Sequence, residues 1–314
     1  VYKRQVRTLE GLESALNAYQ ESIALDADFA PAWTGLSRVL RGQVEYELAD
    51  LQEAMKASRH AAMRALELDS ELAEAWQSLA RIQFSYDWDW SSADASARTA
   101  LKYEPNNAPV LRLATSVALT LGEMERALDL AQRAVDLDPL DYLGLINLAF
   151  AHWALGQPLE EQRVYQRLMD LYPNGSGVEP FLAAALARQG KPEEGLQYLD
   201  LDSEDMWHRS MSTMVLHSLG RREEEQQKLQ NMIDDYGQVW PSGVAMAHAW
   251  HGDTDKAFEY LDIAFKQKSS YMTNLIYNPW LAPLYDDPRW EVVVDKMGLL
   301  EYWTKLQARH EAKP

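Results

Sequence analysis

Small and apolar residues recur every three or four positions over most of the chain, and short polar turns separate the runs. In the stretch from 127 to 134, Ala127, Ala131 and Ala134 occupy positions that share one face of an α-helix. Spacing of this kind is typical of amphipathic helices. We therefore predict an all-α protein.

Glycines that close the helical runs indicate a repeat. They lie at positions 122, 156, 190, 220 and 252, which gives spacings of 34, 34, 30 and 32 residues. Glycine is favoured after a helix because the left-handed backbone conformation that ends the helix is unstrained without a Cβ. An acidic residue follows four of these glycines and suits the start of a helix. The pattern predicts pairs of helices joined by short turns.

A second pattern with a similar period lies on the second helix of each predicted pair. One residue, usually small, is followed four and seven positions later by residues on the same helix face. We call these the seam positions, because small side chains there let two helices approach closely. They are Ala15, Tyr19 and Ser22; Ser58, Ala62 and Ala65; Ala93, Ala97 and Ala100; Ala127, Ala131 and Ala134; Glu161, Tyr165 and Leu168; Glu225, Leu229 and Met232; and Ala257, Leu261 and Ala264.

The first helices of the pairs open on a third pattern. Trp33 and Trp76 each follow an alanine-rich start and are predicted to fill the space between neighbouring pairs. Prolines at 105, 139 and 173 come just after second helices, where proline ends a helix at no cost in internal hydrogen bonds. Three patterns in one register favour a right-handed superhelix (an α-solenoid) of about eight helix-turn-helix units with a C-terminal helical cap. The alternative is an ordinary helical bundle with accidental spacing.

These residues resemble the tetratricopeptide repeat (TPR), from about position 8 to position 267. The resemblance implies a binding scaffold, with the following expected organisation. Residues 1–5 match a translated library adapter and are expected to be a sequencing scar on a truncated reading frame. A partial first repeat covers 6–29, well-formed units 30–175, degenerate units 176–237, a last unit 238–270, and a capping segment with a final helix 271–314.

A narrower resemblance is carried mainly by the C-terminal segments Asn278–Leu284, Asp287–Trp290 and Met297–Leu299. They are similar to the end of the TPR arrays of bacterial TolB-like or winged-helix transcriptional regulators and adenylate cyclase-like proteins. The chain departs from that pattern at Trp290, where Phe is usual, and at Tyr285, where a basic residue is common. The resemblance implies an output domain upstream, for DNA binding or for cyclic-nucleotide synthesis.

Composition narrows the classes of partner. The formal net charge is −18, which repels nucleic acid and anionic membrane surfaces at long range. The chain contains no cysteine, so disulfides and thiolate metal sites are excluded. Its longest apolar stretch, 142–156, is too short to span a bilayer. We expect a protein or peptide partner, no nucleic-acid binding and no membrane insertion by this region.

Motifs for catalysis are missing from the sequence: there is no phosphate-binding glycine loop, no Gly-x-Ser-x-Gly and no His-Glu-x-x-His. His248 and His251, with Asp253 and Asp255, are the nearest approach to a metal cluster, but the histidines span a helix end with no evident supporting shell. We therefore predict no enzyme activity, no catalytic residues, no cofactor and no metal in this region.

A ligand groove is expected along the inner stripe of the first helices. Arginines dominate its first half and suit carboxylates, while methionines and aromatic residues give an adaptable apolar second half. Alternatively, the arginines pair with acids such as Glu74 and the aromatic residues belong to the core. The predicted groove residues are Arg38, Arg41, Gln77, Arg81, Phe84, Arg112, Phe150, Trp153, Met214, Met246 and Trp250, with Ser116, Ile146 and His217 on the same stripe.

Two classes of function remain open besides an enzyme with an unrecognised site. The first is a protein-interaction and sensing scaffold, the regulatory C-terminal part of a larger bacterial signalling or transcription protein, on either the cytoplasmic or the periplasmic side of the inner membrane. The second is a self-association module, a homodimer formed through an exposed surface around Tyr19.

Overall fold

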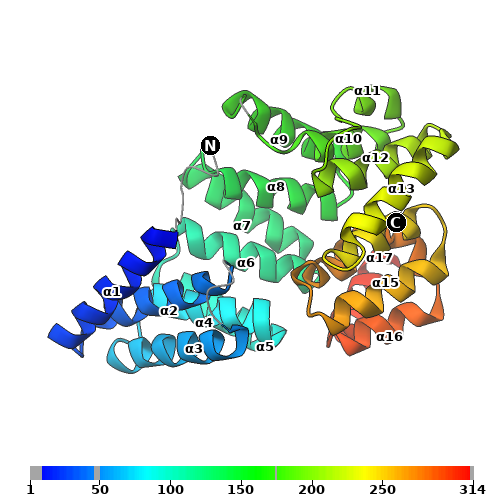
Figure 1. Ribbon diagram of the computed structural model, residues 1–314. Coiled ribbons are helices and arrows are strands. Elements are labelled where there is room, and N and C mark those ends of the chain that lie inside the picture. Colours follow the sequence, from blue (N-terminus) through cyan, green and yellow to red (C-terminus); the bar gives the residue numbers. More distant parts are fainter. Residues whose placement is uncertain (1–8, 46–49, 174, 312–314) are drawn as a thin grey trace. The chain divides into compact units, whose positions relative to one another are not determined.

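The computed structural model describes residues 9–45, 50–173 and 175–311, which form helices joined by turns and contain no β-strand (Figure 1). The predicted all-α fold is confirmed. The expected scar over 1–5 lies outside the described residues. Two compact units divide the chain: the first takes the described residues up to Val117 with Arg133–Asp138, and the second takes Ala118–Gln132 and the described residues from Pro139 on.

The first unit is made of short helices that pack in sequence order, α1 on α2, α2 on α3 and α4 on α5. A π-helical turn, η2, follows α4 directly. Helices α6 and α7 each run through the boundary between the units. The elements are α1 (Leu9–Leu25), α2 (Ala30–Glu45), α3 (Leu51–Leu68), α4 (Ala73–Ile82), η2 (Gln83–Asp87), α5 (Trp90–Tyr103), α6 (Ala108–Thr120) and α7 (Met124–Leu137).

The seam positions of α3 and α5 lie at these helix contacts. Ala62 and Ala65 of α3 are fully buried. Ser58, also fully buried, donates a hydrogen bond to the Ser37 carbonyl of α2 at 2.8 Å. Small side chains therefore bring the paired helices close together, as predicted.

Tyr19 packs inside the first pair rather than on an open surface. A Cβ added at Gly35 of α2 would lie 2.2 Å from the Tyr19 ring, so the ring rests directly on that backbone. Its hydroxyl accepts a hydrogen bond from Arg38 Nη2 at 3.1 Å. Glycine at position 35 makes room for the ring, which leaves Tyr19 half-buried, and the self-association expected around it stays a prediction.

The second unit continues the same arrangement, with α8 packed on α9, α10 on α11, α12 on α13 and α14 on α15. Two 3₁₀ segments and two helices follow. The elements are α8 (Tyr142–Ala154), α9 (Pro158–Leu171), α10 (Glu179–Arg188), α11 (Pro192–Leu196), α12 (Met206–Ser218), α13 (Arg222–Tyr236), α14 (Pro241–Trp250), α15 (Thr254–Lys266), η3 (Ser270–Tyr277), η4 (Pro279–Leu284), α16 (Pro288–Lys296) and α17 (Leu300–Glu311).

The repeated glycines take the conformation predicted for them. All five, from Gly122 to Gly252, have φ between 64° and 80°. The N–H after each glycine donates to a carbonyl five residues earlier, as Asp253 does to His248 at 2.9 Å. This hydrogen bond and the left-handed residue form the tight helix end known as a Schellman motif, which sets the direction of the following helix.

The segment Ser270–Leu284, made of η3 and η4, packs against more of the second unit than the last helix pair. The Thr120 hydroxyl at the end of α6 donates to the Thr273 carbonyl at 2.9 Å. The Tyr277 ring meets Trp153 of α8 edge to face at 6.0 Å between centroids. Asn278 Nδ2 lies 2.8 Å from Met246 Sδ of α14. The segment therefore contacts α6 and α8 as well as the last helix pair.

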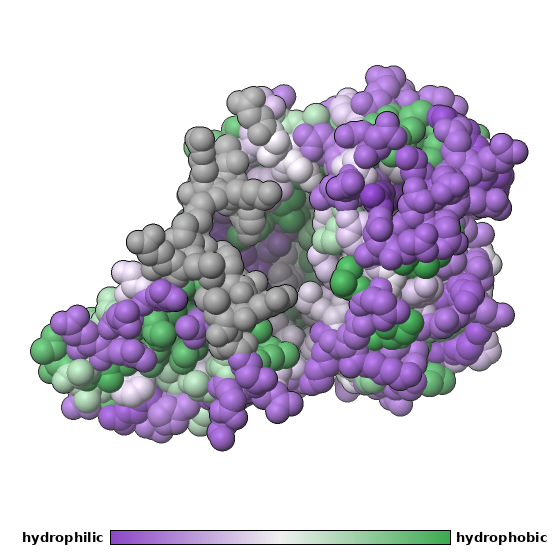
Figure 2. Space-filling view, viewed as in Figure 1, coloured by the Kyte–Doolittle hydropathy of each residue, from purple (hydrophilic) through white to green (hydrophobic). Residues whose placement is uncertain are grey.

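The surface over α13 is polar on the face that Figure 2 shows. The side chains over α13 are hydrophilic in the view of Figure 2, and the first turn of this helix carries Glu223 and Glu224, both exposed. Among the described residues, no helix combines the length and the apolar character needed to cross a membrane.

Candidate functional site: an aromatic cavity and a histidine cluster

The predicted groove residues of the first unit differ in their exposure. Arg38 is exposed and donates to Tyr19. Phe84 is buried and meets Trp90 edge to face at 5.9 Å. The remaining residues are half-buried: Arg41, Gln77, Arg81 and Arg112.

The predicted groove residues of the second unit divide between the core and one cavity. Met214 has no exposed surface and belongs to the core. Trp250 meets Trp280 of η4 edge to face at 4.6 Å. Phe150, Trp153 and Met246 are brought together around a cavity whose volume is about 40 Å³. One water needs about 10–15 Å³ on this scale, so the cavity has room for a small group such as a side chain.

Aromatic rings form much of the cavity wall. Phe181 of α10 lies between Phe150 of α8, at 6.3 Å, and Trp207 of α12, at 4.8 Å. Trp207 in turn meets Tyr271 of η3 at 5.6 Å. Helices α8, α10 and α12 thus each supply at least one ring, and the segments η3 and η4 add Tyr271, Leu275 and Trp280 to the wall.

A buried ion pair stands among these rings. Arg188, the last residue of α10, donates to the carboxylate of Glu161 in the first turn of α9. Both side chains line the cavity, and only 11% of Arg188 and 3% of Glu161 is exposed. The guanidinium lies over the Trp280 ring at 5.4 Å, and Arg188 Nε is buried with no acceptor among the described residues. Burial raises the pKa of Glu161 to about 7, because removing water disfavours the charged form more than Arg188 favours it.

Sequence reasoning missed Glu161, Arg188, Trp207 and Tyr271 as cavity residues. One signal was available: Glu161 occupies a seam position where the well-formed units carry Ala or Ser. A carboxylate at a buried position requires a partner, so it could have pointed to a donor on the next helix pair. No comparable signal marks Tyr271, because its place depends on how the C-terminal segment packs.

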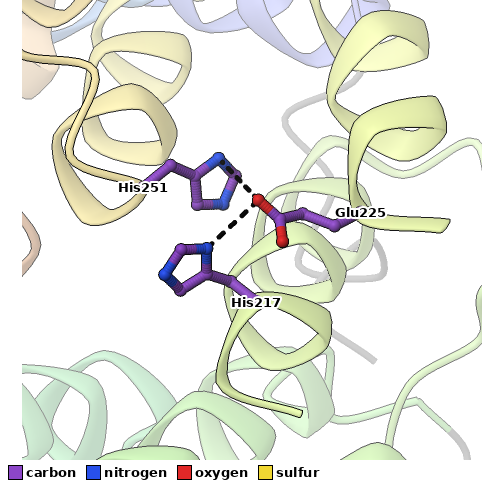
Figure 3. A group of neighbouring side chains, drawn as sticks. All are labelled: His217, Glu225 and His251. Atoms are coloured by element: carbon purple, nitrogen blue, oxygen red, sulfur yellow. Dashed lines mark hydrogen bonds and ion pairs between the residues drawn. The ribbon is translucent and has the colours of Figure 1, made fainter. Parts of the chain in front are cut away.

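A cluster of three metal-ligating side chains lies elsewhere in the second unit (Figure 3). Glu225 Oε1 is 3.1 Å from His217 Nδ1 and 3.4 Å from His251 Nδ1. The two imidazole rings are stacked, with centroids 4.7 Å apart and planes 14° from parallel. Glu225 is another seam position, and His217 was assigned to the groove stripe.

The four residues that the sequence suggested as a metal cluster do not lie together in the structure. His251 faces Glu225, whereas His248 Nδ1 lies 3.4 Å from Asp253 and its ring stacks on Tyr260. Asp255 pairs with Arg289 at 2.7 Å. Of these four residues, only His251 belongs to the cluster with His217 and Glu225.

Comparison with known proteins shows the fold and nothing finer. No family's sequence profile matches the chain, and no curated protein matches it. Among solved structures, PilF of Pseudomonas aeruginosa has a TM-score of 0.51 at 16% identity, over 80% of this chain and 99% of its own. Yeast Tom70 has a TM-score of 0.51 at 15% identity, over 92% of this chain and 62% of its own. YrrB, described as a TPR protein with an unusual peptide-binding site, has a TM-score of 0.48 at 18% identity, over 67% of this chain and all of its own.

The solved structures confirm the all-α repeat fold. The chain is built of TPR-like helix pairs, as the three sequence patterns predicted. At these identities the likeness carries no information on ligands or partners.

Proposed function

We propose that the chain is a protein-interaction scaffold that binds a partner peptide by taking one of its side chains into the aromatic cavity of the second unit. The observation that carries this proposal is the cavity itself: aromatic rings from successive helix pairs surround a space that the chain leaves unfilled. Pockets with mostly apolar walls and a few polar groups are where proteins usually bind ligands.

The chemistry of the wall specifies the side chain. Phe181, Trp207 and Tyr271 favour an apolar group. Arg188 Nε is a buried donor without an acceptor in the described chain. A carbonyl oxygen next to the bound side chain would remove the cost of that unsatisfied donor. The ligand that fits best is therefore a peptide with a small apolar residue whose backbone carbonyl reaches Arg188.

A peptide display selection on the whole chain tests the proposal. We expect enrichment of peptides that share one small aliphatic residue. Ala184→Trp, at a cavity-wall position that is 3% exposed, would fill the space and weaken binding of the selected peptides by about tenfold or more. Leu159→Trp, at a 58% exposed position of α9, is the matched control and should bind as the unmodified chain does.

Two results would contradict the proposal. One is a selection with no shared apolar residue. The other is equal peptide affinity for the unmodified chain and for Ala184→Trp when circular dichroism shows both to be folded. Arg188→Gln provides a second variant, because it keeps much of the side chain's volume while removing the Nε donor.

The wider assignment, to the regulatory part of a bacterial signalling or transcription protein, is supported only by the resemblance at Asn278–Leu284 and Asp287–Trp290. Obtaining the complete gene tests it, since an output domain should precede this region. Self-association is less favoured than ligand binding, because Tyr19 is packed on Gly35. Its remaining support is the exposure of Leu25 and Phe29, at 83% and 47%.

A further inference from the structure

The histidine cluster draws its three side chains from three consecutive helices of the second unit. His217 is in the last turn of α12, Glu225 in the first turn of α13, and His251 directly follows α14. The left-handed glycines Gly220 and Gly252 end α12 and α14 within three residues of each histidine. Defined helix ends therefore hold the side chains in position, as a preorganised site requires.

Two of the three distances between the ligand atoms are close to those of a tetrahedral site. Zinc binds imidazole nitrogen and carboxylate oxygen at about 2.0–2.2 Å, so neighbouring ligand atoms of a tetrahedral site are about 3.3–3.5 Å apart. The two measured separations from Glu225 Oε1, 3.1 Å to His217 and 3.4 Å to His251, are close to that edge length. One ligand atom from each of the three residues lies within 4.8 Å of the others.

Burial differs among the three side chains. The side chains of Glu225 and His251 are only 6% and 7% exposed, whereas 21% of His217 is exposed. An ion would enter from the His217 side.

A positive charge is already close to this site. Arg222 Nη1 donates to Glu225 Oε2 at 3.0 Å and also reaches His217 Nδ1. The Arg222 side chain is 59% exposed, so it can leave for solvent at little cost. A metal ion would neutralise the charge of Glu225 and would be bound by the lone pair of His217 in place of Arg222. Arg222 would therefore compete with the ion.

We propose that His217, Glu225 and His251 bind one divalent transition-metal ion of the zinc class, with water completing the coordination. Two imidazoles and one carboxylate form a ligand set that zinc uses with an open position. The ion would fasten the pair α12–α13 to α14. This site is separate from the proposed peptide cavity, whose lining includes none of the three residues.

Calorimetric titration of the whole chain, without a polyhistidine tag, with ZnCl₂ tests the proposal. We expect one saturable ion per chain. His217→Ala, Glu225→Gln and His251→Ala should each weaken binding by about tenfold or more, since changes even outside the ligand set cost 10–100-fold. The control His152→Ala removes a histidine of the same unit whose Nδ1 pairs with Gln157 at 2.8 Å, and it should leave affinity unchanged.

Arg222→Ala separates metal binding from a purely structural network. Removal of the competing positive charge should leave the zinc affinity equal or higher. If Arg222 were instead a ligand or a contact that the site requires, Arg222→Ala would lower the zinc affinity. Ring signals of His217 and His251 in the NMR spectrum of the unmodified protein should shift on adding Zn²⁺, which keeps the test valid if a variant fails to fold.

Three results would overturn the proposal: absence of saturable Zn²⁺ binding, zinc binding that survives both Glu225→Gln and His251→Ala, or equal affinity for Mg²⁺. The last would indicate a general attraction of cations to an acidic surface. Weaker zinc binding by Arg222→Ala would also contradict the assigned geometry.

Discussion

Two seam positions of the second unit carry a glutamate where seam positions of the first unit carry a small residue. In the first unit the leading seam residues of α3 and α5 are Ser58 and Ala93, both small and fully buried. In the second unit the corresponding residues of α9 and α13 are Glu161 and Glu225, whose exposed fractions are only 2% and 4%. In α9 and α13, therefore, a position that lets helices approach closely in the first unit holds a buried carboxylate.

The partners of the two glutamates explain how the fold tolerates a buried carboxylate at a seam position. Glu161 pairs with Arg188, 27 residues later, and Glu225 lies beside His251, 26 residues later. Each partner stands at the end of the first helix of the next pair. A buried carboxylate without a donor would be strongly unfavourable. The comparison shows that a seam can carry a charge where the following helix pair supplies a donor, and both candidate sites of the second unit include such a glutamate.

The largest effect on stability is expected from a glutamate placed at a seam position of the first unit. Ala93→Glu places a carboxylate at a fully buried position of α5 and should lower the free energy of unfolding by about 3–5 kcal/mol. Denaturant unfolding followed by circular dichroism measures it. Ala95→Glu, on the exposed face of the same helix, is the control and should change stability by less than about 0.5 kcal/mol. A small effect of Ala93→Glu would show that the small-residue seam is not needed.

An intermediate, pH-dependent effect is expected at Glu161. Its pKa is about 7 in the folded chain and about 4.5 for an ordinary glutamate in water, so the folded state holds the proton more tightly. The contribution of Glu161 to the free energy of unfolding is fully present below pH 4.5 and is lost as the pH rises through 7. The total change in that free energy is on the order of 3 kcal/mol. The stability of the unmodified chain relative to Glu161→Gln should therefore fall between pH 4.5 and 8 in denaturant titrations. A relative stability that rises over this range would mean that pairing with Arg188 outweighs burial.

The smallest effect is expected at the neighbouring surface pair. Glu160 and Arg163 lie 2.5 Å apart, but their side chains are 44% and 71% exposed. Water and salt screen such a pair, so Arg163→Ala should change the free energy of unfolding by less than about 0.5 kcal/mol. Thermal unfolding at low and high salt checks this. If Arg163→Ala lowered the free energy of unfolding by as much as is expected at Glu161, burial would not be what distinguishes Glu160 from Glu161.

The sequence alone determined the repeating element of this protein. Helical periodicity, the left-handed glycines and the prolines after second helices are local signals, because each depends on backbone conformation within a few residues. The helix pairs and the conformation of Gly122 to Gly252 therefore agree with prediction.

Tertiary structure decided the composition of the candidate sites. The Thr120–Thr273 hydrogen bond joins residues 153 positions apart, and no local pattern encodes the packing of Ser270–Leu284 against α8 and α14. The same packing brings Tyr271 to the cavity wall. The stacking of α14 beside the pair α12–α13 brings His251 to Glu225. Periodicity places a residue on a helix face, but only the packing of whole helices decides which other face it meets.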